Sequence, residues 1–311
     1  MMTMQGTVTS VTGPLAPDTL GITHSHEHIL WDYFDLINSY DVIFDDETVA
    51  ATELDWFKNA GGGTLVDCTT TGLTPRPAAL RRISEQTGVN IVLGCGWYRE
   101  RVWGAEVGEK TSARLAEVLV RHLTTGFDDT DVVAGFIGEI GTERHHISPA
   151  EERVFRAAGL ASLQTGAAIV THTTHFGELA LEQIDLLEEV GVAPDRIVIS
   201  HMGDREDVDH LLRIADRGVY LSIDNVGYES DGYPDDSVRL RSLAALIEHG
   251  HADRVVLGTD IAQRSALRSY GGRGYDWLIR DFIPKMRAAG LSEEHIVAAT
   301  VTNIARALTR P

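Results

Sequence analysis

Cysteine is scarce in this sequence, with only Cys68 and Cys95 among 311 residues. Two thiols cannot form the disulfide framework of a small secreted domain, and they agree with a reducing cytoplasm, where we expect the protein to reside. We expect both thiols to be buried packing residues, because free cysteines are commonly buried.

Long apolar runs are also lacking. The first twenty residues contain no apolar core of a secretion signal, and no run elsewhere reaches about 18 apolar residues, so neither export nor a membrane span is indicated. Basic residues are few: 27 Lys and Arg face 46 Asp and Glu, which gives a net charge of −19. This charge repels phosphate backbones and anionic bilayers, so we expect a small-molecule substrate rather than nucleic acid or a membrane.

Eight short apolar runs alternate with longer amphipathic stretches. The runs are rich in Val, Ile, Leu and Thr, as strands buried on both faces are. The expected strands are residues 21–26, 63–69, 90–94, 132–140, 168–173, 196–201, 219–224 and 254–260. The expected helices include residues 46–60, 112–124, 149–164, 179–190, 207–216 and 238–248.

This alternation predicts an α/β fold with a parallel sheet, and eight repeats favour a closed (β/α)8 TIM barrel over an open sheet. No Gly-x-Gly-x-x-Gly turn follows the first strand, and no linker divides the chain. We therefore expect a single domain over residues 1–311, with a short β segment at about residues 1–20 before strand one.

Histidines cluster at the end of the first expected strand, in a His-Ser-His-Glu-His stretch that begins at His24. Residues two apart on a strand point to the same face. Either His24 with His26 or His26 with His28 could therefore direct two imidazoles at one metal ion. The spacing leaves both pairs open.

Four other expected strands end in a potential ligand: Glu139, His172, His201 and Asp260. Taken singly, each has an ordinary structural interpretation, such as a salt bridge for Glu139 or a turn cap for Asp260. Barrel active sites, however, are built at the carboxyl ends of several strands at once. Four imidazoles and two carboxylates exceed the needs of one tetrahedral zinc and suit two divalent ions that share a carboxylate.

The motifs, in this order, resemble the phosphotriesterase family of the amidohydrolase superfamily. The matching stretches are His-Glu-His-Ile at 26–29, Gly-Glu-Ile-Gly-Thr at 138–142, Thr-His-Thr at 171–173, Ser-His at 200–201 and Thr-Asp at 259–260. Gly-Gly-Arg-Gly-Tyr-Asp at 271–276 and Val-Thr-Asn at 301–303 are also similar. Well-known members bridge their metals with a carboxylated lysine, whereas Glu139 stands there in this chain, as in the lactonase-like phosphotriesterase-homology branch.

The resemblance implies a metal-ligand set. It assigns His26, His28, Glu139 and Asp260 to one ion and Glu139, His172 and His201 to the other, and it leaves His24 outside the site. Zinc is the expected metal, with manganese or cobalt as alternatives, and Glu139 and a hydroxide would bridge the pair. The hydroxide would be the nucleophile, and Asp260 would be the catalytic residue that orients it and takes its proton. Barrels of this family are often homodimers.

The implied activity is hydrolysis of a carboxylic ester or lactone, with a phosphorylated sugar lactone as one candidate. Phosphotriester hydrolysis is the alternative. A mononuclear deaminase of the same superfamily would leave Glu139 without a role, and a ligand-binding barrel without turnover would not need the complete ligand set.

Substrate contacts are expected from loops at the same end of the barrel. Three arginines follow strand eight with no acidic residue before Asp276, in a region where barrels commonly bind phosphate, so an anionic substrate is expected there. The alternative is that these arginines pair with surface carboxylates. The residues predicted to bind substrate are Tyr98, Tyr228, Arg264, Arg268, Arg273 and Tyr275.

Overall fold

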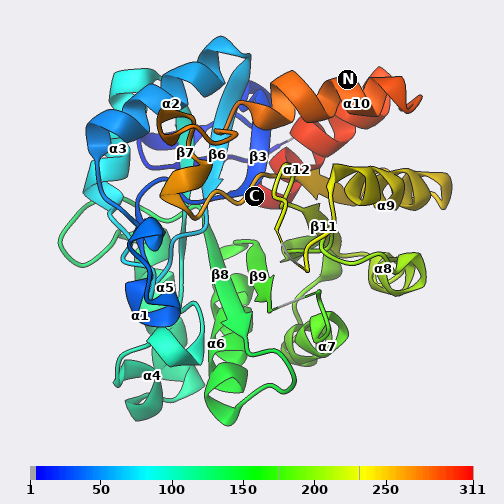
Figure 1. The fold of residues 1–311 in the computed structure, drawn as a ribbon. Coiled ribbons are helices and arrows are strands. Elements are labelled where there is room, and N and C mark those ends of the chain that lie inside the picture. Colours follow the sequence, from blue (N-terminus) through cyan, green and yellow to red (C-terminus); the bar gives the residue numbers. More distant parts are fainter. Residues whose placement is uncertain (1–4, 175, 231, 311) are drawn as a thin grey trace.

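Eight parallel strands form a ring with helices on its outside (Figure 1). The computed structural model describes residues 5–174, 176–230 and 232–310. The order in the sheet is β12-β11-β10-β9-β8-β7-β6-β3, and each strand is parallel to its neighbour. The strands are β3 (Ile22–Glu27), β6 (Gly62–Asp67), β7 (Asn90–Cys95), β8 (Phe136–Thr142), β9 (Ile169–Thr173), β10 (Ile197–Ile199), β11 (Tyr220–Ile223) and β12 (Val255–Leu257). The predicted (β/α)8 barrel is confirmed.

The helices between the strands agree with the amphipathic stretches of the sequence. They are α2 (Glu47–Asn59), α3 (Pro77–Thr87), α5 (Ser112–Thr124), α6 (Pro149–Thr165), α7 (Ala180–Val190), α8 (Val208–Ala215) and α9 (Asp236–Glu248). The chain then continues through α10 (Ile283–Ala288), α11 (Glu293–Val297) and α12 (Asn303–Leu308), with π-helical turns at Leu278–Phe282 and Ala298–Thr302. Among the described residues, no helix is both long and apolar enough to span a bilayer.

Short strands, helices and 3-10 turns lie at the two ends of the barrel. The N-terminal β segment is a hairpin of β1 (Val8–Ser10) and β2 (Gly13–Leu15), while residues 1–4 lie outside the described part. Near the carboxyl ends of the strands lie β4 (Trp31–Asp32), α1 (Phe34–Ile37), β5 (Ile43–Phe44) and α4 (Glu106–Glu109). The 3-10 turns are η1 (Pro17–Thr19), η2 (Tyr40–Val42), η3 (Glu100–Val102), η4 (Pro194–Arg196), η5 (Arg264–Ala266) and η6 (Arg268–Tyr270).

The fourth strand begins later than the expected residue 132. The chain before β8 bonds elsewhere: Val132 C=O accepts from Phe127 N–H at 3.1 Å, and Ala134 N–H donates to His122 C=O at 2.9 Å. These bonds join Val132 and Ala134 to the end of α5 and its loop, and bonding to β7 begins at Gly135, whose N–H donates to Leu93 C=O at 2.8 Å. The apolar character of the segment alone could not show whether its backbone bonds to a neighbouring strand or to α5 and the loop after it.

Both faces of the strands are apolar and buried. Val66, Val92, Val170, Val198 and Val256 belong to an inner cluster that is completed by α12, whereas a second, larger cluster lies between the strands and the outer helices. Cys68 and Cys95 are free, and both are buried in these cores. The amino-terminal part of the barrel interior is therefore filled by apolar side chains, and the polar side chains lie at the carboxyl ends of the strands.

The ring closes where β12 meets β3. Among the described residues the sheet ladder does not continue across this junction, but Asp260 N–H donates to His26 C=O at 3.2 Å. Gly258 allows the close approach, because a Cβ there would lie 2.8 Å from His26 O and 3.0 Å from His26 N. The junction therefore holds the first and last strand ends together.

We predict that Gly258→Ala opens this junction. The added methyl group would meet backbone atoms that cannot rotate away, and we expect a loss of about 1–3 kcal/mol in the free energy of unfolding. Chemical denaturation measures this loss. The control is Gly108→Ala in α4, where a Cβ meets nothing within 4 Å, so stability should be kept or slightly raised. Equal stability of the two variants would contradict the prediction.

Candidate metal centre

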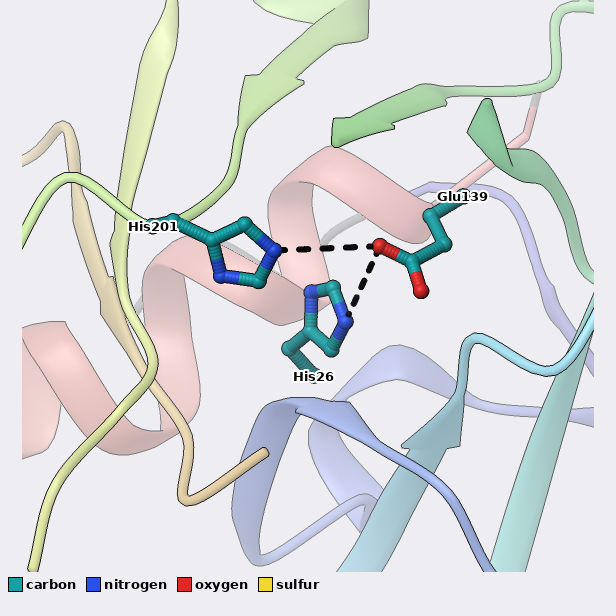
Figure 2. Close-up of side chains that lie close together, drawn as sticks. All are labelled: His26, Glu139 and His201. Carbon is teal, nitrogen blue, oxygen red and sulfur yellow. Dashed lines mark ion pairs between the residues drawn. The ribbon is translucent and has the colours of Figure 1, made fainter. Parts of the chain in front are cut away.

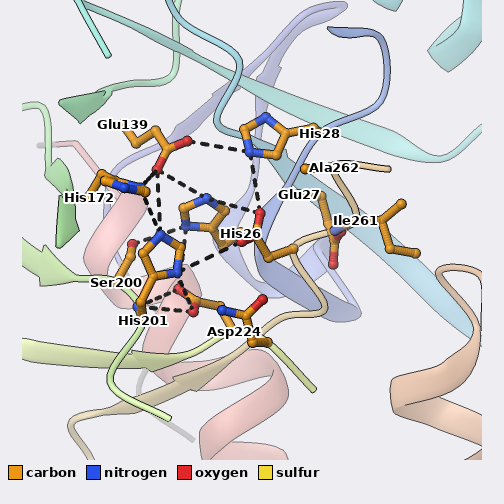
Figure 3. Close-up of polar contacts among 12 residues, drawn as sticks. His26, Glu27, His28, Glu139, His172, Ser200, His201, Asp224, Ile261 and Ala262 are labelled. Carbon is orange, nitrogen blue, oxygen red and sulfur yellow. Dashed lines mark hydrogen bonds and ion pairs between the residues drawn. The ribbon is translucent and has the colours of Figure 1, made fainter. Parts of the chain in front are cut away.

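Six side chains from five strand ends converge at the carboxyl end of the barrel. They come from β3 and the residue after it, from within β8 and β9, and from the segments that follow β10 and β12. They are the six predicted ligands His26, His28, Glu139, His172, His201 and Asp260. The structure thus brings together every residue of the predicted ligand set. Figure 3 labels the four histidines and Glu139.

The first group surrounds one point between His26, His28, Glu139 and Asp260. His28 Nε2 lies 3.3 Å from Asp260 Oδ1 and 3.4 Å from Glu139 Oε1. His26 Nε2 lies 3.4 Å from Glu139 Oε2 and 3.7 Å from Asp260 Oδ1. Zinc ligands at about 2.0–2.2 Å in a tetrahedron are about 3.3–3.6 Å apart. His26 Nε2 is buried without a hydrogen-bond partner, so the donor set fits a divalent ion.

The second group lies on the other side of Glu139. His172 Nδ1 is 3.0 Å from Glu139 Oε2 and 2.8 Å from His201 Nε2, and His201 Nε2 is 3.9 Å from the same oxygen. Figure 2 shows His26 and His201 both directed at this carboxylate. One oxygen of Glu139 faces His28 and the other faces the remaining three imidazoles. A carboxylate that serves two ions needs this position.

Contacts behind the imidazoles fix their orientation. His26 Nδ1 lies 3.0 Å from Ser200 Oγ, and His28 Nδ1 lies 3.0 Å from Thr69 Oγ1. With Nδ1 engaged, each ring presents Nε2 to the cluster, which is the arrangement that metal-binding histidines use.

Two of the six residues have left-handed backbones, with φ of 65° at His201 and 44° at Asp260. This conformation costs about 1–2 kcal/mol in a non-glycine residue, and it persists only where other contacts hold it. At His201 the holding group is Asp224, which follows β11. Its Oδ1 accepts from the backbone N–H and from Nδ1, both at 3.0 Å, and its Oδ2 accepts from the N–H at 3.1 Å.

The cluster has a negative potential. Burial opposes protonation of His28, but the carboxylates of Asp260 and Glu139 raise its pKa to about 10. Burial also opposes ionisation of Glu139, yet His26 and His172 hold its pKa well below the ordinary value. The carboxylates are therefore ionised and attract positive charge. Divalent cations would supply that charge if the imidazoles stay neutral.

A cavity of about 250 Å³ opens onto the cluster. Apolar side chains of Leu36, Ile37 and Leu73 line part of it, and four tyrosines and two arginines line the rest. Asp204 also faces the cavity. Burial raises its pKa to about 7 although His201 opposes the shift, and Oδ2 accepts from Asn225 Nδ2 at 2.8 Å. The cavity is large enough only for a small molecule.

Three of the six predicted substrate-binding residues line this cavity: Tyr98, Tyr228 and Arg273. The Tyr98 hydroxyl also lies 3.3 Å from His172 Nε2. Arg273 donates from Nη2 to Thr259 O at 2.6 Å, and its guanidinium lies over the Tyr228 ring at 5.5 Å. It forms no ion pair with any described carboxylate.

The other three, Arg264, Arg268 and Tyr275, lie outside the cavity lining. Arg264 is exposed and stacks on Tyr270 at 5.6 Å. Arg268 pairs with Asp276 at 2.8 Å, a carboxylate that is buried and not on the surface, where the alternative expected its partner. Tyr275 is buried, and its hydroxyl donates to His28 O at 2.6 Å. We therefore assign these three no contact with substrate.

His24 lies apart from the cluster, which decides between the two histidine pairs that the spacing left open. Its Nδ1 is 2.6 Å from Glu27 Oε1, and its ring packs on Phe57 at 4.9 Å. An irregularity in β3 between His24 and Glu27 breaks the simple alternation of side chains. His26 and His28 form the pair at the site, as the family resemblance implied.

Sequence reasoning missed several residues around the cluster, namely Glu27, Tyr33, Arg99, Asp204 and Asp224. A usable signal existed for Asp224, because it ends an apolar strand as Asp260 does. Arg99 sits in a loop and pairs with Glu143 at 2.5 Å, a contact that no local pattern announces.

We predict that Asp224→Asn weakens metal binding through His201. The amide oxygen can replace Oδ1, but the amide NH2 would then occupy the position of Oδ2 and face the backbone N–H of His201, 3.1 Å away. The substitution also removes the negative charge beside the ring N–H, and outer contacts of this kind typically affect metal affinity about 10–100-fold. Equilibrium dialysis against buffered zinc, followed by elemental analysis, measures the affinity. The control is Asp207→Asn, the cap of α8, which contacts no predicted ligand. Unchanged affinity in Asp224→Asn would refute the assignment.

Known proteins share this fold. A sequence model of the phosphotriesterase family matches residues 6–308. N-acetyltaurine hydrolase from Danio rerio is 31% identical, with 99% of each chain covered. Among solved structures, the phosphotriesterase homology protein from Escherichia coli, complexed with phosphate in its active site, has a TM-score of 0.90 and 32% identity over 94% of this chain and 100% of that chain. A lactonase from Listeria monocytogenes has a TM-score of 0.91 and 27% identity over 97% of this chain and 99% of that chain.

Proposed function

Because this chain belongs to the phosphotriesterase family of metal-dependent hydrolases, we propose that it hydrolyses a carboxylic ester or lactone that carries an anionic group. Family membership makes the chain an enzyme that acts on a small molecule, and the alternative of a barrel without turnover falls away. The observation that carries the finer proposal is the position of Glu139 between two groups of histidines, beside a cavity lined by an unpaired arginine.

Two divalent ions would complete the centre. His26, His28, Glu139 and Asp260 would hold one, and Glu139, His172 and His201 the other. Nitrogen and oxygen donors at this spacing suit zinc, with manganese or cobalt as alternatives. When bound, the ions supply an activated water and polarise the scissile carbonyl.

Asp260 is the group best placed to take a proton. Its side chain is 17% exposed, compared with 2% for Glu139, so Asp260 is the more accessible of the two carboxylates that line the cavity. Burial opposes its ionisation, but His26 and His28 lower its pKa, so the carboxylate is ionised at neutral pH. An ionised, accessible carboxylate can accept the proton of the attacking water.

We predict that Asp260→Asn lowers kcat about 10²–10⁴-fold, the range that general-base groups contribute. Steady-state kinetics on the zinc-loaded protein measures the loss, and thermal unfolding together with elemental analysis reports the fold and the metal content. A variant that keeps both metal ions and full turnover would remove Asp260 from the mechanism.

Arg273 supports the choice of an anionic substrate. Among the described residues its buried Nε has no hydrogen-bond partner, and the hydrogen bond that its guanidinium makes goes to the uncharged Thr259 carbonyl. Burial lowers the pKa of Arg273 although the carboxylates of Glu27 and Asp260 oppose the shift, so a counterion in direct contact would be favourable. A carboxylate, sulfonate or phosphate on the substrate would supply that counterion from the cavity side. The phosphate in the related Escherichia coli active site agrees with this chemistry.

We predict that Arg273→Met lowers kcat/KM about 10–100-fold for anionic substrates, the size of one charge-assisted hydrogen bond, and leaves neutral aryl esters nearly unaffected. The matched control is Arg268→Met. That arginine belongs to the same loop but pairs with Asp276 outside the cavity. Equal losses on charged and neutral substrates would contradict the assigned role.

An amide that carries a sulfonate is a second candidate, because the relative named N-acetyltaurine hydrolase is aligned over 99% of both chains. N-acetyltaurine, like a phosphorylated lactone, carries an anionic group. The bond cleaved would be an amide in N-acetyltaurine and an ester in the lactone. The deciding assay compares a phosphorylated sugar lactone, N-acetyltaurine, a neutral aryl ester and the phosphotriester paraoxon on metal-free and zinc-restored protein. Turnover of the lactone that returns with zinc supports the proposal. Preferred turnover of N-acetyltaurine selects the amide, and preferred turnover of paraoxon selects the phosphotriesterase alternative.

A further inference from the structure

The left-handed backbone of Asp260 raises the question of what holds it. Asp260 N–H donates to His26 O across the barrel junction at 3.2 Å, which fixes one peptide. The side chain points into the ion-binding cluster and contributes no contact to its own backbone among the bonds of the described residues. The two neighbouring residues must therefore carry much of the constraint.

Glu27 bonds the backbone on both sides of Asp260. Glu27 and Ile261 are labelled in Figure 3. Its Oε1 accepts from Thr259 N–H at 2.7 Å and from the Thr259 hydroxyl at 2.5 Å. Its Oε2 accepts from Ile261 N–H at 3.0 Å. The carboxylate is fully buried and is itself held by His24, whose Nδ1 lies 2.6 Å from Oε1.

Glu27 does not line the cavity, and its oxygens are already engaged, so it contacts neither substrate nor the ion-binding point. We propose that Glu27 is a positioning residue. By bonding Thr259 and Ile261, it holds the left-handed backbone that presents the Asp260 carboxylate to the metal centre. This inference rests on the role that the proposed function gives to Asp260.

A buried carboxylate also holds the left-handed backbone at His201. There Asp224 accepts the backbone N–H of the left-handed residue and also its ring N–H. The two left-handed members of the cluster are thus each held by a buried carboxylate from the end of a neighbouring strand.

Glutamine at position 27 tests the idea with nearly unchanged shape. An amide has one accepting oxygen and one donating nitrogen, whereas both ends of Glu27 face N–H donors. Either orientation of the amide therefore sets N–H against N–H on one side of Asp260, and rotation of the side chain cannot repair this.

For Glu27→Gln we expect kcat to fall about 10–100-fold, as with other outer contacts of metal ligands, while KM changes less than about threefold. The crystal structure of the zinc-loaded variant should show Asp260 displaced from its φ of 44°. The matched control is Glu53→Gln. Glu53 is also a buried carboxylate, and it accepts from Arg268 N–H and Ser269 N–H of the same loop, farther along the chain. This control should keep kcat.

A kcat within twofold of wild type in Glu27→Gln, or an equal loss in Glu53→Gln, would overturn the proposal. If Glu27→Gln does not fold, Thr259→Val and Thr259→Ser decide. Serine keeps the hydroxyl that Glu27 accepts and should retain activity, whereas valine removes it and should lose several-fold in kcat. Equal activity of these two variants overturns the proposal. Failure of the proposed function has a different signature, namely zinc-loaded wild-type protein that hydrolyses nothing in the substrate panel.

Discussion

Buried negative charge is the constraint that shapes the carboxyl end of this barrel. Glu27, Asp67, Glu139 and Asp224 are all almost completely removed from water. An uncompensated buried carboxylate is strongly unfavourable, so each one requires donors or cations around it. Backbone N–H groups donate hydrogen bonds to Glu27 and Asp67, and imidazoles contact Asp224 and Glu139. Metal ions would provide further positive charge to Glu139. The histidine-rich character of the site follows from this requirement.

Closure of the barrel places the charged side chains of the site at defined positions. His26 and Asp260 are separated by most of the chain, yet they meet because β3 and β12 are the two ends of one sheet. The contact that joins them is made by the backbone, and Gly258 gives it room. The positions of the two side chains are therefore set by the closure of the barrel and depend little on flexible loops. Sites built on such rigid elements keep their geometry better than sites built on loops.

The sequence pattern predicted the eight strands and placed Glu139, His172, His201 and Asp260 at strand ends, because these features depend on apolar periodicity. The choice of His26 with His28 came from the family resemblance. The pattern could not choose between the histidine pairs, since the irregularity in β3 that turns His24 away leaves no local signal. It also misplaced Arg268 and Tyr275. Their orientation depends on Asp276 and on the carbonyl of His28, contacts that exist only after the loop has folded. Glu27 was overlooked because the backbone groups that it holds, at Thr259 and Ile261, lie more than 200 residues away in sequence.

Thr259 connects the two halves of the proposed chemistry. Its N–H and hydroxyl bond to Glu27, and its carbonyl accepts from Arg273 at 2.6 Å. Thr259 is thus held between the buried Glu27 carboxylate and the Arg273 guanidinium, which lines the cavity. Asp260 is the next residue in the chain. The arginine that would bind the charged end of a substrate and the carboxylate that would take the proton share a backbone segment. A shift of Arg273 toward a bound anion would therefore act on the same segment that Glu27 holds in place, so in the proposed mechanism substrate binding and proton transfer would depend on one set of hydrogen bonds.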